Sequence, residues 1–363
     1  MNNNTSKTNY DILFVGGHHN SSLPLIQKFM KDGYSIKFIG HKYASKLNDF
    51  VSSEYTEMQS YGIPYINLNT PKFYNNNDLL KYIQLLKSVV FCFKLFISER
   101  PSLIMSFGGY LAVPVVIAGK LLNIKIATHE QTAVKGLANN MIAKFADKIY
   151  LTWDISKKHY TNKSEVVGLP IREEILSVKK NKPNAYIKTI FVQGGKQGSH
   201  IINDFIFSNI DYLCSKYVIY HQTGKHSIND DHVKAEKLSK KYPNYKTFTY
   251  LYGKDYTKIL NKVDLVLGRS GAHMVYELAY LKIPAIFVPI SWSSNNEQYF
   301  NAKLANEYLP CYIIEEKNLN ISNFKKALKY ISTTLRKNTS YLEVTSKATE
   351  AIYTSIKKNF FNG

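Results

Sequence analysis

Short apolar runs alternate with stretches of helical periodicity along the whole chain. Residues 10–15 and 189–192 share one design, in which an apolar run ends in two glycines and is followed by apolar positions at helical spacing. This pattern is typical of a strand, a tight turn and an amphipathic helix, the opening unit of a doubly wound α/β domain. The two glycine pairs lie about half the chain apart, so the pattern predicts two tandem Rossmann-like domains.

Seven further short apolar runs are separated by helical stretches, as parallel βα repeats require. They are residues 35–39, 102–106, 125–128, 148–152, 218–221, 264–268 and 285–289. A polar, proline-bearing stretch separates the halves, so we expect an N-terminal domain over 1–166, a linker over 167–186 and a C-terminal domain over 187–340. A last helix is expected from about Tyr341 to Asn359, and residues 341–363 are candidates to pack back on the N-terminal domain.

Composition narrows the class of protein. Apolar residues make up 45% and aromatic residues 13% of the 363 positions, which predicts a globular chain with room for two cores. The three cysteines (Cys92, Cys214, Cys311) are too widely spaced for a disulfide framework or a cysteine-rich zinc site, so we expect a reducing compartment. No stretch approaches the roughly 20 apolar residues of a membrane span, and the polar N-terminus does not resemble a signal peptide.

The formal net charge of +20 predicts an anionic partner. Nucleic acid, an anionic membrane surface and phosphorylated substrates are the candidates, and compositional drift toward Lys, Asn, Ile and Tyr is an alternative origin of the charge. The chain has no helix-turn-helix, RNP or zinc-finger pattern, so a nucleic-acid partner is not expected.

Two glycine-containing turns in the C-terminal half lie between a predicted strand and a predicted helix. In GGKQGS (194–199), backbone N–H groups and the helix N-terminus would face a phosphate, and Lys196 adds positive charge. In RSGA (269–272), Ser270 is a candidate N-cap. Two helix N-termini at one crevice suit a diphosphate, although either turn could equally be only a tight connection.

Other polar groups are expected at the same crevices. Glu277 lies about two helical turns after Ser270, where a carboxylate could accept hydrogen bonds from both hydroxyls of a ribose. A solvated helix glutamate is the alternative. The amides of 295–302 suit sugar hydroxyls, and His18 and His19 in the first glycine turn are candidates for acid–base catalysis or for a purely structural role.

The order of these motifs closely resembles the MurG family, the inverting GT-B glycosyltransferases that complete lipid II. The resemblance spans roughly residues 10–315 and rests on the first Gly-Gly turn, SFGGY, HEQTAVKGLANN, VVGLPIREEI, GGKQGS, HQTGK, RSGA and NNEQYFNA. It implies an α/β fold of two Rossmann-like domains facing a central cleft. It also implies transfer of N-acetylglucosamine from UDP-N-acetylglucosamine to lipid I, a polyprenyl-diphosphate-linked acceptor, by a peripheral protein at the cytoplasmic face of the cell membrane.

The resemblance assigns roles to individual residues. It implies that Arg172 reaches the diphosphate of the nucleotide sugar and that Glu277 holds the ribose. Lys196 stands where the family usually has Ser, and Thr132 where it has Asn. Ala272, His273 and Met274 would line the uridine and phosphate, and Asn296, Glu297 and Gln298 would meet the sugar. The other substrate-binding candidates are Gly17, Asn20, Gln197, Gly198, Ser270 and Gly271.

The largest departure from the family lies at the first turn, where the family has GGTGGHxxP. Aligned on Pro24, the family's proposed basic histidine falls on Ser21, and His18 and His19 replace a Thr and a Gly. A serine hydroxyl cannot act as a free general base near neutral pH. Either one of these histidines is therefore the base, or the mechanism depends on stabilising the leaving group.

No cofactor or metal is expected, because the chain contains no D-x-D pair to hold one. The alternatives are a related GT-B transferase with another polyprenyl-diphosphate acceptor, a 2-epimerase of the same fold and a nucleotide-sugar-binding protein without turnover.

The predicted helix over 82–97 is apolar on nearly all sides. One stripe contains Ile83, Leu86, Val90, Phe93 and Ile97, and a second contains Leu85, Val89, Cys92 and Phe96. Such a helix is usually core, but the interspersed Lys81, Lys87 and Lys94 make insertion into an anionic membrane surface the alternative.

Overall fold

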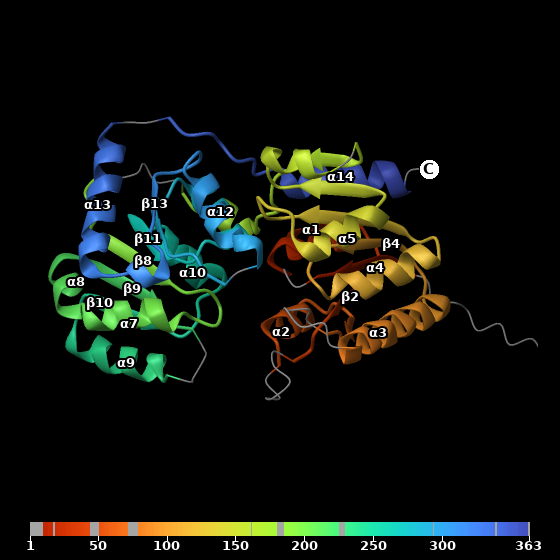
Figure 1. Cartoon of the computed structure of the whole chain (residues 1–363), viewed down its shortest axis with the longest axis horizontal. Coiled ribbons are helices and arrows are strands. Elements are labelled where there is room, and N and C mark those ends of the chain that lie inside the picture. The colour runs from red at the N-terminus through yellow and green to blue at the C-terminus, as the bar shows by residue number, and fades with distance from the viewer. Residues whose placement is uncertain are drawn as a thin grey trace, which may run out of the picture. The chain divides into compact units, whose positions relative to one another are not determined.

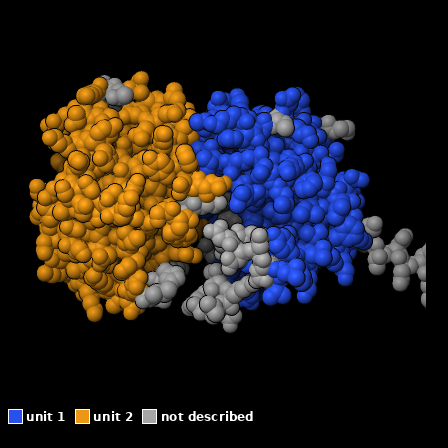
Figure 2. Space-filling model, viewed as in Figure 1, with its two compact units in different colours: residues 1–172, 346–363 blue, residues 173–345 orange. Residues whose placement is uncertain are grey.

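The structure of the protein, a computed structural model, divides into two compact units (Figure 2). Unit 1 comprises Met1–Arg172 and Ser346–Gly363, and unit 2 comprises Glu173–Thr345. The residues that the structure describes are 10–16, 19–43, 51–71, 79–160, 162–179, 185–224, 229–292, 294–337 and 340–361.

Unit 1 contains a seven-stranded parallel sheet in the order β3-β2-β1-β4-β5-β6-β7 (Figure 1). The strands are β1 (Tyr10–Val15), β2 (Ile36–Gly40), β3 (Tyr65–Asn67), β4 (Pro101–Ser106), β5 (Lys125–Glu130), β6 (Lys148–Leu151) and β7 (Ser164–Val166). The α-helices of this unit are α1 (His19–Lys31), α2 (Ser53–Ser60), α3 (Leu79–Ser98), α4 (Ala112–Leu121), α5 (Leu137–Phe145) and α14 (Ala348–Ile356).

Both faces of this sheet are buried, as a parallel sheet covered by helices requires. Leu13 and Val15 of β1 belong to a core with residues of α3, α4 and α5. Ile12 and Phe14 point to the opposite face, into a second core that contains residues of α1 and α14. The alternation of side chains along each strand therefore explains why the strands are apolar runs rather than apolar–polar alternations.

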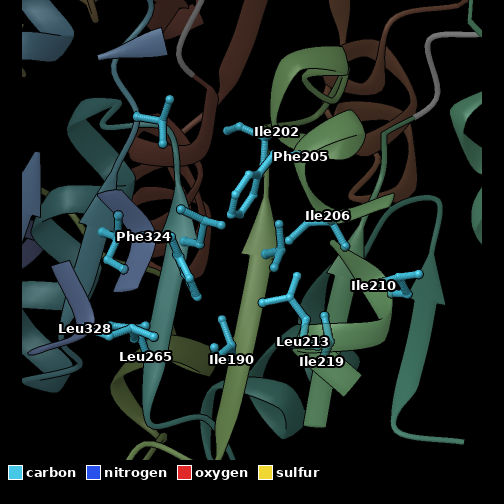
Figure 3. Close-up of a cluster of buried hydrophobic side chains, with 14 of the residues drawn as sticks. Ile190, Ile202, Phe205, Ile206, Ile210, Leu213, Ile219, Leu265, Phe324 and Leu328 are labelled. Carbon is cyan, nitrogen blue, oxygen red and sulfur yellow. The ribbon is translucent and has the colours of Figure 1, made fainter. Parts of the chain in front are cut away.

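Unit 2 contains a six-stranded parallel sheet in the order β10-β9-β8-β11-β12-β13. The strands are β8 (Thr189–Gln193), β9 (Val218–Gln222), β10 (Tyr245–Phe248), β11 (Leu265–Gly268), β12 (Ala285–Phe287) and β13 (Cys311–Ile313). Its α-helices are α6 (Glu173–Leu176), α7 (His200–Ser208), α8 (Ile210–Lys216), α9 (Asp231–Lys241), α10 (Gly253–Leu260), α11 (Ala272–Leu281), α12 (Glu297–Ala305) and α13 (Ile321–Arg336). Figure 3 shows one of its cores, where Ile190 of β8 and Leu265 of β11 lie among side chains of α7 and α13.

All nine strands predicted from the sequence are present, with bounds that differ by at most a few residues. The structure adds β3, β7, β10 and β13, which the sequence did not predict. These four are the outermost strands of the two sheets. They are only three or four residues long and largely half-buried, so their sequences (YIN, SEV, YKTF, CYI) lack the apolar run on which the prediction depended.

The predicted C-terminal helix begins later than expected. The structure has no helix over 341–347, and α14 starts at Ala348. The preceding stretch is bound to the rest of unit 2, because the backbone N–H of Leu342 donates to the carbonyl of Glu307 and the Tyr276 hydroxyl donates to the carbonyl of Thr345. Helix α14 itself packs against α1 of unit 1, where Lys28 forms an ion pair with Glu350 at 2.8 Å.

One side of helix α3 packs against the core of unit 1, and the other side is exposed to solvent. Cys92 and Phe96 are buried, and Leu85 and Val89 of the same stripe pack against the core beneath them. Most of the other stripe is exposed, and the exposed apolar residues of the helix are Leu79, Leu80, Tyr82, Ile83, Leu86, Val90, Phe91 and Ile97. Among the described helices, none is both long and apolar enough to cross a membrane.

Candidate functional site

Each sheet has one point at which the strand order changes direction, and the glycine turns lie there. In unit 1 this point is between β1 and β4, and in unit 2 it is between β8 and β11. Ligands of doubly wound domains bind at the carboxyl ends of the strands at such a point. The turns after β1 and β4 in unit 1, and those after β8 and β11 in unit 2, are therefore the candidate binding regions.

The first glycine turn is tightly packed. Gly16 has φ +142°, and a Cβ there would lie 3.1 Å from Phe107 and from the carbonyl oxygen of Gly108, so the turn lies against SFGGY. Gly17 and His18 lie outside the described residues. His19 begins α1 and is 5% exposed.

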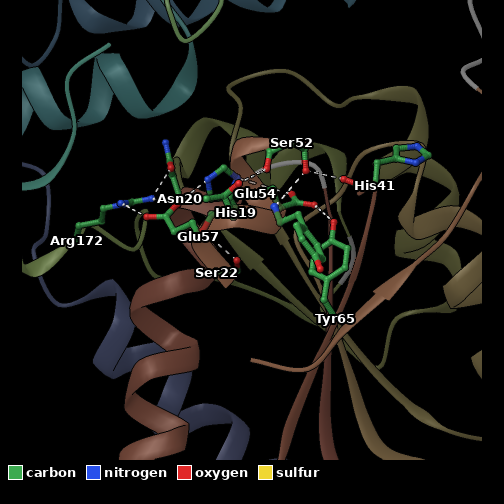
Figure 4. A network of polar contacts seen from close by, with 11 residues as sticks. His19, Asn20, Ser22, His41, Ser52, Glu54, Glu57, Tyr65 and Arg172 are labelled. Atoms are coloured by element: carbon green, nitrogen blue, oxygen red, sulfur yellow. Dashed lines mark hydrogen bonds and ion pairs between the residues drawn. The ribbon is translucent and has the colours of Figure 1, made fainter. Parts of the chain in front are cut away.

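His19 lies between two carboxylates of α2 (Figure 4). Its Nε2 is 2.8 Å from Oε2 of Glu57, and its Nδ1 is 3.8 Å from Oε2 of Glu54. Glu54 also accepts a hydrogen bond from the Tyr65 hydroxyl at 2.8 Å. His19, one of the two candidate bases, is thus a buried side chain whose two ring nitrogens both face acidic groups.

Arg172 contacts the same carboxylate. Its Nη1 and Nη2 donate to the two oxygens of Glu57 at 2.6 and 2.9 Å, and Nη2 also donates to Oδ1 of Asn20 at 2.7 Å. Glu57 therefore brings together His19 and Arg172, and Arg172 in turn contacts Asn20 (Figure 4). Burial raises the pKa of Glu57, but the hydrogen bonds from His19 and Arg172 outweigh it and lower the pKa to about 2.

Thr132 lies in a loop organised by the buried carboxylate of Glu130. The carboxylate accepts hydrogen bonds from the backbone N–H of Thr132 (3.1 Å) and its hydroxyl (2.9 Å), from Asn139 Nδ2 (2.8 Å) and from the Tyr160 hydroxyl (2.8 Å). The Thr132 hydroxyl also lies 2.5 Å from the carbonyl oxygen of Val134. The proton of this hydroxyl is therefore donated within the loop, so the oxygen can only accept a hydrogen bond from a ligand.

In unit 2 the GGKQGS turn interlocks with the HQTGK turn after β9. Gly198 and Gly224 both have φ +88°, and a Cβ on either residue would collide with the backbone of the other turn. The side chain of Gln222 supports the same contact by donating to the carbonyl of Gly195 at 3.1 Å. Lys196 is half-buried and Gln197 is exposed, so the side chains of this turn remain near the surface.

Ser270 is fully buried and does not cap α11. Its hydroxyl donates to the backbone carbonyl of Gln298 at 2.7 Å, and the N-cap is Gly271. The predicted N-cap was therefore wrong, because α12 offers this hydroxyl a carbonyl acceptor. Ala272, His273 and Met274 form the first turn of α11.

Glu277 is 9% exposed, so the alternative of a solvated helix glutamate is wrong. His273 Nδ1 lies 3.9 Å from its Oε1. Burial, and secondarily the charge of Glu277, raise the pKa of Tyr256, whose hydroxyl is 3.4 Å from Gln193 Nε2. Gln193 Nε2 also donates to Met274 Sδ at 3.0 Å, so this group joins β8, α10 and α11.

The residues predicted to meet the sugar surround the start of α12. Asn296 is the exposed N-cap, with φ +53°, and Glu297 and Gln298 follow it half-buried. Gln298 Oε1 accepts a hydrogen bond from the backbone N–H of Ile290 at 3.2 Å. The amide of Gln298 therefore holds the loop after β12.

The sequence did not single out Arg269, Glu57, Gln193 or Tyr256. Arg269 donates to the carbonyl of Val288 (2.9 Å) and to the Ser199 hydroxyl (2.6 Å), and it pairs with Glu316 at 2.6 Å. It thus ties the GGKQGS turn to the segments after β12 and β13. The position of Arg269 in RSGA could have marked it as a candidate. The spacing of Glu54 and Glu57, which places both on one face of a helix, could have marked Glu57, whereas no sequence pattern marked Tyr256.

Comparison with known proteins agrees with this architecture. Residues 15–151 match the glycosyltransferase family 28 N-terminal domain and residues 189–360 match the family 28 C-terminal domain. The two parallel sheets and these two matches define the class, and the chain belongs to glycosyltransferase family 28.

Curated relatives narrow the family further. A Clostridium botulinum protein, 30% identical over 87% of this chain and 88% of its own length, is named UDP-N-acetylglucosamine--N-acetylmuramyl-(pentapeptide) pyrophosphoryl-undecaprenol N-acetylglucosamine transferase. A Bacillus cereus protein with the same name and the number 2 is 28% identical over 95% of this chain and 98% of its own length. The particular branch of family 28 to which this chain belongs is therefore the MurG family.

Solved structures agree on the fold. Acinetobacter baumannii MurG has a TM-score of 0.67 at 19% identity, covering 96% of this chain and 99% of that one. A UDP-GlcNAc 2-epimerase from Neisseria meningitidis has a TM-score of 0.64 at 12% identity, covering 97% and 100%. Both the transferase and the epimerase share this two-sheet architecture, so the fold alone does not separate the two activities.

Proposed function

We propose that the protein transfers N-acetylglucosamine from UDP-N-acetylglucosamine to an N-acetylmuramyl-pentapeptide carried on pyrophosphoryl-undecaprenol, with inversion to a β-linkage. The observation that carries this proposal is the 30% identity over 87% of the chain with a relative named for that reaction. The glycine turns at the strand-order change of both sheets support it, since two diphosphate substrates need two such regions.

The donor site is proposed in unit 2. The N-termini of α7 and α11, with Lys196, would provide positive potential for the departing diphosphate, which is where charge develops in this displacement. The buried Glu277 would accept hydrogen bonds from the ribose hydroxyls. Ser270, Gly271 and the first turn of α11 would lie beside the nucleotide, and Asn296, Glu297 and Gln298 beside the sugar.

The acceptor site is proposed in unit 1, at the first glycine turn, with Gly17, Asn20 and Thr132 as binding residues. Of the two candidate bases, His18 suits direct contact with the acceptor hydroxyl better than His19. His19 is 5% exposed and its Nε2 is engaged by Glu57, which favours a supporting role. The base must lie within hydrogen-bond reach of the proton that it removes.

The two histidines can be separated by substitution. We expect His18→Ala to lower kcat about 100-fold or more, the usual contribution of general acid–base catalysis. His19→Gln should lower kcat less, because glutamine can still donate to Glu57. A loss of kcat confined to His19→Gln would show that the assignment of the base is reversed.

The outer face of α3 is proposed to contact an anionic membrane surface. Its exposed apolar side chains would enter the interface, and the exposed Lys87 and Lys94 would meet lipid phosphates. A cavity of about 560 Å³ opens between this helix and the segment after β3. The cavity is lined by both polar and apolar side chains, among them Asn67, Ile83, Lys87 and Phe91. It therefore matches the mixed polar and apolar character of a lipid surface.

Vesicle cosedimentation tests the membrane contact. Binding should rise with the anionic lipid content and fall when Lys87 and Lys94 are both changed to Glu. The matched control is Lys237→Glu, which reverses an exposed lysine on α9 of unit 2 and should leave binding unchanged. Binding that ignores anionic lipid, or that responds equally to the control, would contradict the proposal.

Release of UDP distinguishes the proposed transferase from its rivals. We expect UDP to be released from UDP-N-acetylglucosamine only when lipid I is present. A 2-epimerase, whose fold the protein also shares, needs no acceptor and would invert C2 of the sugar while the sugar stays linked to UDP. Binding with neither release nor epimerisation would favour a nucleotide-sugar-binding protein, and release with a different polyprenyl-diphosphate sugar alone would identify another acceptor.

A further inference from the structure

Arg172 is the residue that the family resemblance assigns to a diphosphate, yet in this structure a carboxylate holds it. Three of its five N–H donors are used by Glu57 and Asn20. The contact with Glu57 is bidentate, the geometry in which arginine binds carboxylates and phosphates alike. Glu57 therefore occupies the position that an oxyanion of a ligand would take on the guanidinium.

Glu57 has a second basic partner, His19. The side chains of Glu57 and His19 are 22% and 7% exposed, so the carboxylate is half-buried and the imidazole in contact with it is buried. Among the described residues, Glu54 and Glu57 of α2 are carboxylates that face the ring nitrogens of His19, and Arg172 contacts Glu57 as well. The carboxylate is ionised, since its pKa is lowered to about 2 although burial raises it.

The second partner changes what happens when Arg172 leaves. A buried carboxylate left without a counter-charge is strongly destabilising. Glu57 would not be left so, because the hydrogen bond from His19 at 2.8 Å remains. A diphosphate offers more charge and more acceptor oxygens than a carboxylate, so exchange of one for the other on Arg172 is favourable when the ligand arrives.

We propose that Arg172 exchanges Glu57 for the diphosphate of a substrate, and that Glu57 is a positioning residue which holds the guanidinium at the start of α1 until then. The proposal rests on the proposed function, in which both substrates contain a diphosphate. After the exchange, the contact with His19 remains and keeps Glu57 ionised and hydrogen-bonded.

Titration calorimetry on the full chain tests the exchange with two probes. UDP represents the donor, and geranyl diphosphate represents the acceptor. Glu57→Gln removes the competing charge and should tighten binding of one probe about tenfold, a difference that a single charge-assisted hydrogen bond can supply. The probe that responds identifies the source of the diphosphate.

Two further variants give responses that a merely structural role would not produce. His19→Gln should weaken binding of the same probe, because Glu57 then loses its contact with the imidazole and depends more strongly on Arg172. In an Arg172→Ala background, Glu57→Gln should have no effect on binding. The matched control is Glu99→Gln, which removes the carboxylate of another partly buried ion pair in unit 1 and should leave both affinities unchanged.

The opposite result is equally clear. If Glu57→Gln weakens both probes as much as Arg172→Ala does, or changes neither, Arg172 does not exchange partners and the proposal is overturned. Thermal melting of each variant separates a loss of folding from a loss of binding. Failure of the proposed function would look different, since the unsubstituted chain would then bind UDP but transfer no sugar to lipid I.

Discussion

At the scale of residues, each candidate region contains a carboxylate withdrawn from solvent, buried in the case of Glu277 and half-buried in the case of Glu57. Glu277 lies beside Tyr256 and His273 in unit 2, and Glu57 lies between His19 and Arg172 in unit 1. Glu57 contacts residues of other elements, and Glu277 lies beside Tyr256 of α10 and His273 of its own helix, so each has a defined orientation before a ligand binds. Such preorganised groups are expected to act on binding and catalysis rather than only on stability.

Glu277 is expected to act on donor binding. Glu277→Gln should raise the KM for UDP-N-acetylglucosamine about tenfold or more, as expected for loss of hydrogen bonds to a charged group, with a smaller change in kcat. Steady-state kinetics with lipid I in excess measure both constants. Glu236→Gln, at an exposed glutamate of α9, is the control, and equal effects of the two variants would refute the ribose assignment.

Glu57 predicts a specific acid dependence of stability. Its pKa falls from the ordinary 4.5 to about 2 in the folded protein, so the ionised group stabilises the fold above about pH 4.5. This stabilisation is lost as the pH falls from 4.5 toward 2. The difference in the free energy of unfolding of unit 1 between the unsubstituted chain and Glu57→Gln should therefore shrink over that range, and a difference that stays constant with pH would contradict the pairing.

The pairing of Glu57 with Arg172 could not be predicted from the sequence, whereas Glu277 could be singled out from its own helix. Glu277 follows a glycine turn on its own helix, so the relation is local. Glu57 meets Arg172 across 115 positions of the chain, and only the fold brings them together. Tyr256 was missed for the same reason, and although Arg269 stands in RSGA, its partners also come from separate elements.

At the scale of elements, burial decided which strands were predictable. The nine inner strands are apolar because both faces of each sheet are covered, and the sequence shows them as runs. The four outer strands are short and half-buried, and their residues resemble those of loops. Edge strands take their structure from the neighbour to which they add, which the sequence of the strand itself does not record.

The interlocked turns of unit 2 give a prediction at this scale. Gly198→Ala introduces both backbone strain at φ +88° and a collision with the turn at Thr223, so it should lower the melting temperature and weaken UDP binding. Gly195→Ala is the matched control, because that residue has φ +90° but open space around its Cα. Strain alone costs about 1–3 kcal/mol, so equal effects of both variants would show that the contact between turns is unimportant.

At the scale of the whole molecule, the chain returns to its starting unit. Residues 346–363 belong to unit 1, and Ile352, Tyr353 and Ile356 of α14 are part of its core. The C-terminal helix is therefore a structural part of the unit proposed to bind the acceptor.

The net charge of +20 also acts at the scale of the whole molecule, since a diphosphate donor, a diphosphate acceptor and a lipid surface are all anionic.

This arrangement predicts which unit depends on α14. Ile352 is fully buried, and Ile352→Ala should destabilise unit 1 by about 2–5 kcal/mol. Calorimetry should show one of two unfolding transitions moving to lower temperature. Ile331→Ala, at a fully buried position of α13 in unit 2, should move the other transition, and both variants moving the same one would contradict the assignment.

The most direct test of the proposed activity is transfer of radiolabelled N-acetylglucosamine from UDP-N-acetylglucosamine to lipid I in the presence of EDTA. The sequence has no D-x-D pair, and the proposed stabilisation of the leaving diphosphate comes from helix N-termini and basic side chains. We therefore expect label in the lipid fraction at the same rate with and without the chelator. No label in the lipid fraction would contradict the activity, and loss of transfer in EDTA with recovery on adding Mg²⁺ or Mn²⁺ would contradict the metal-independent mechanism.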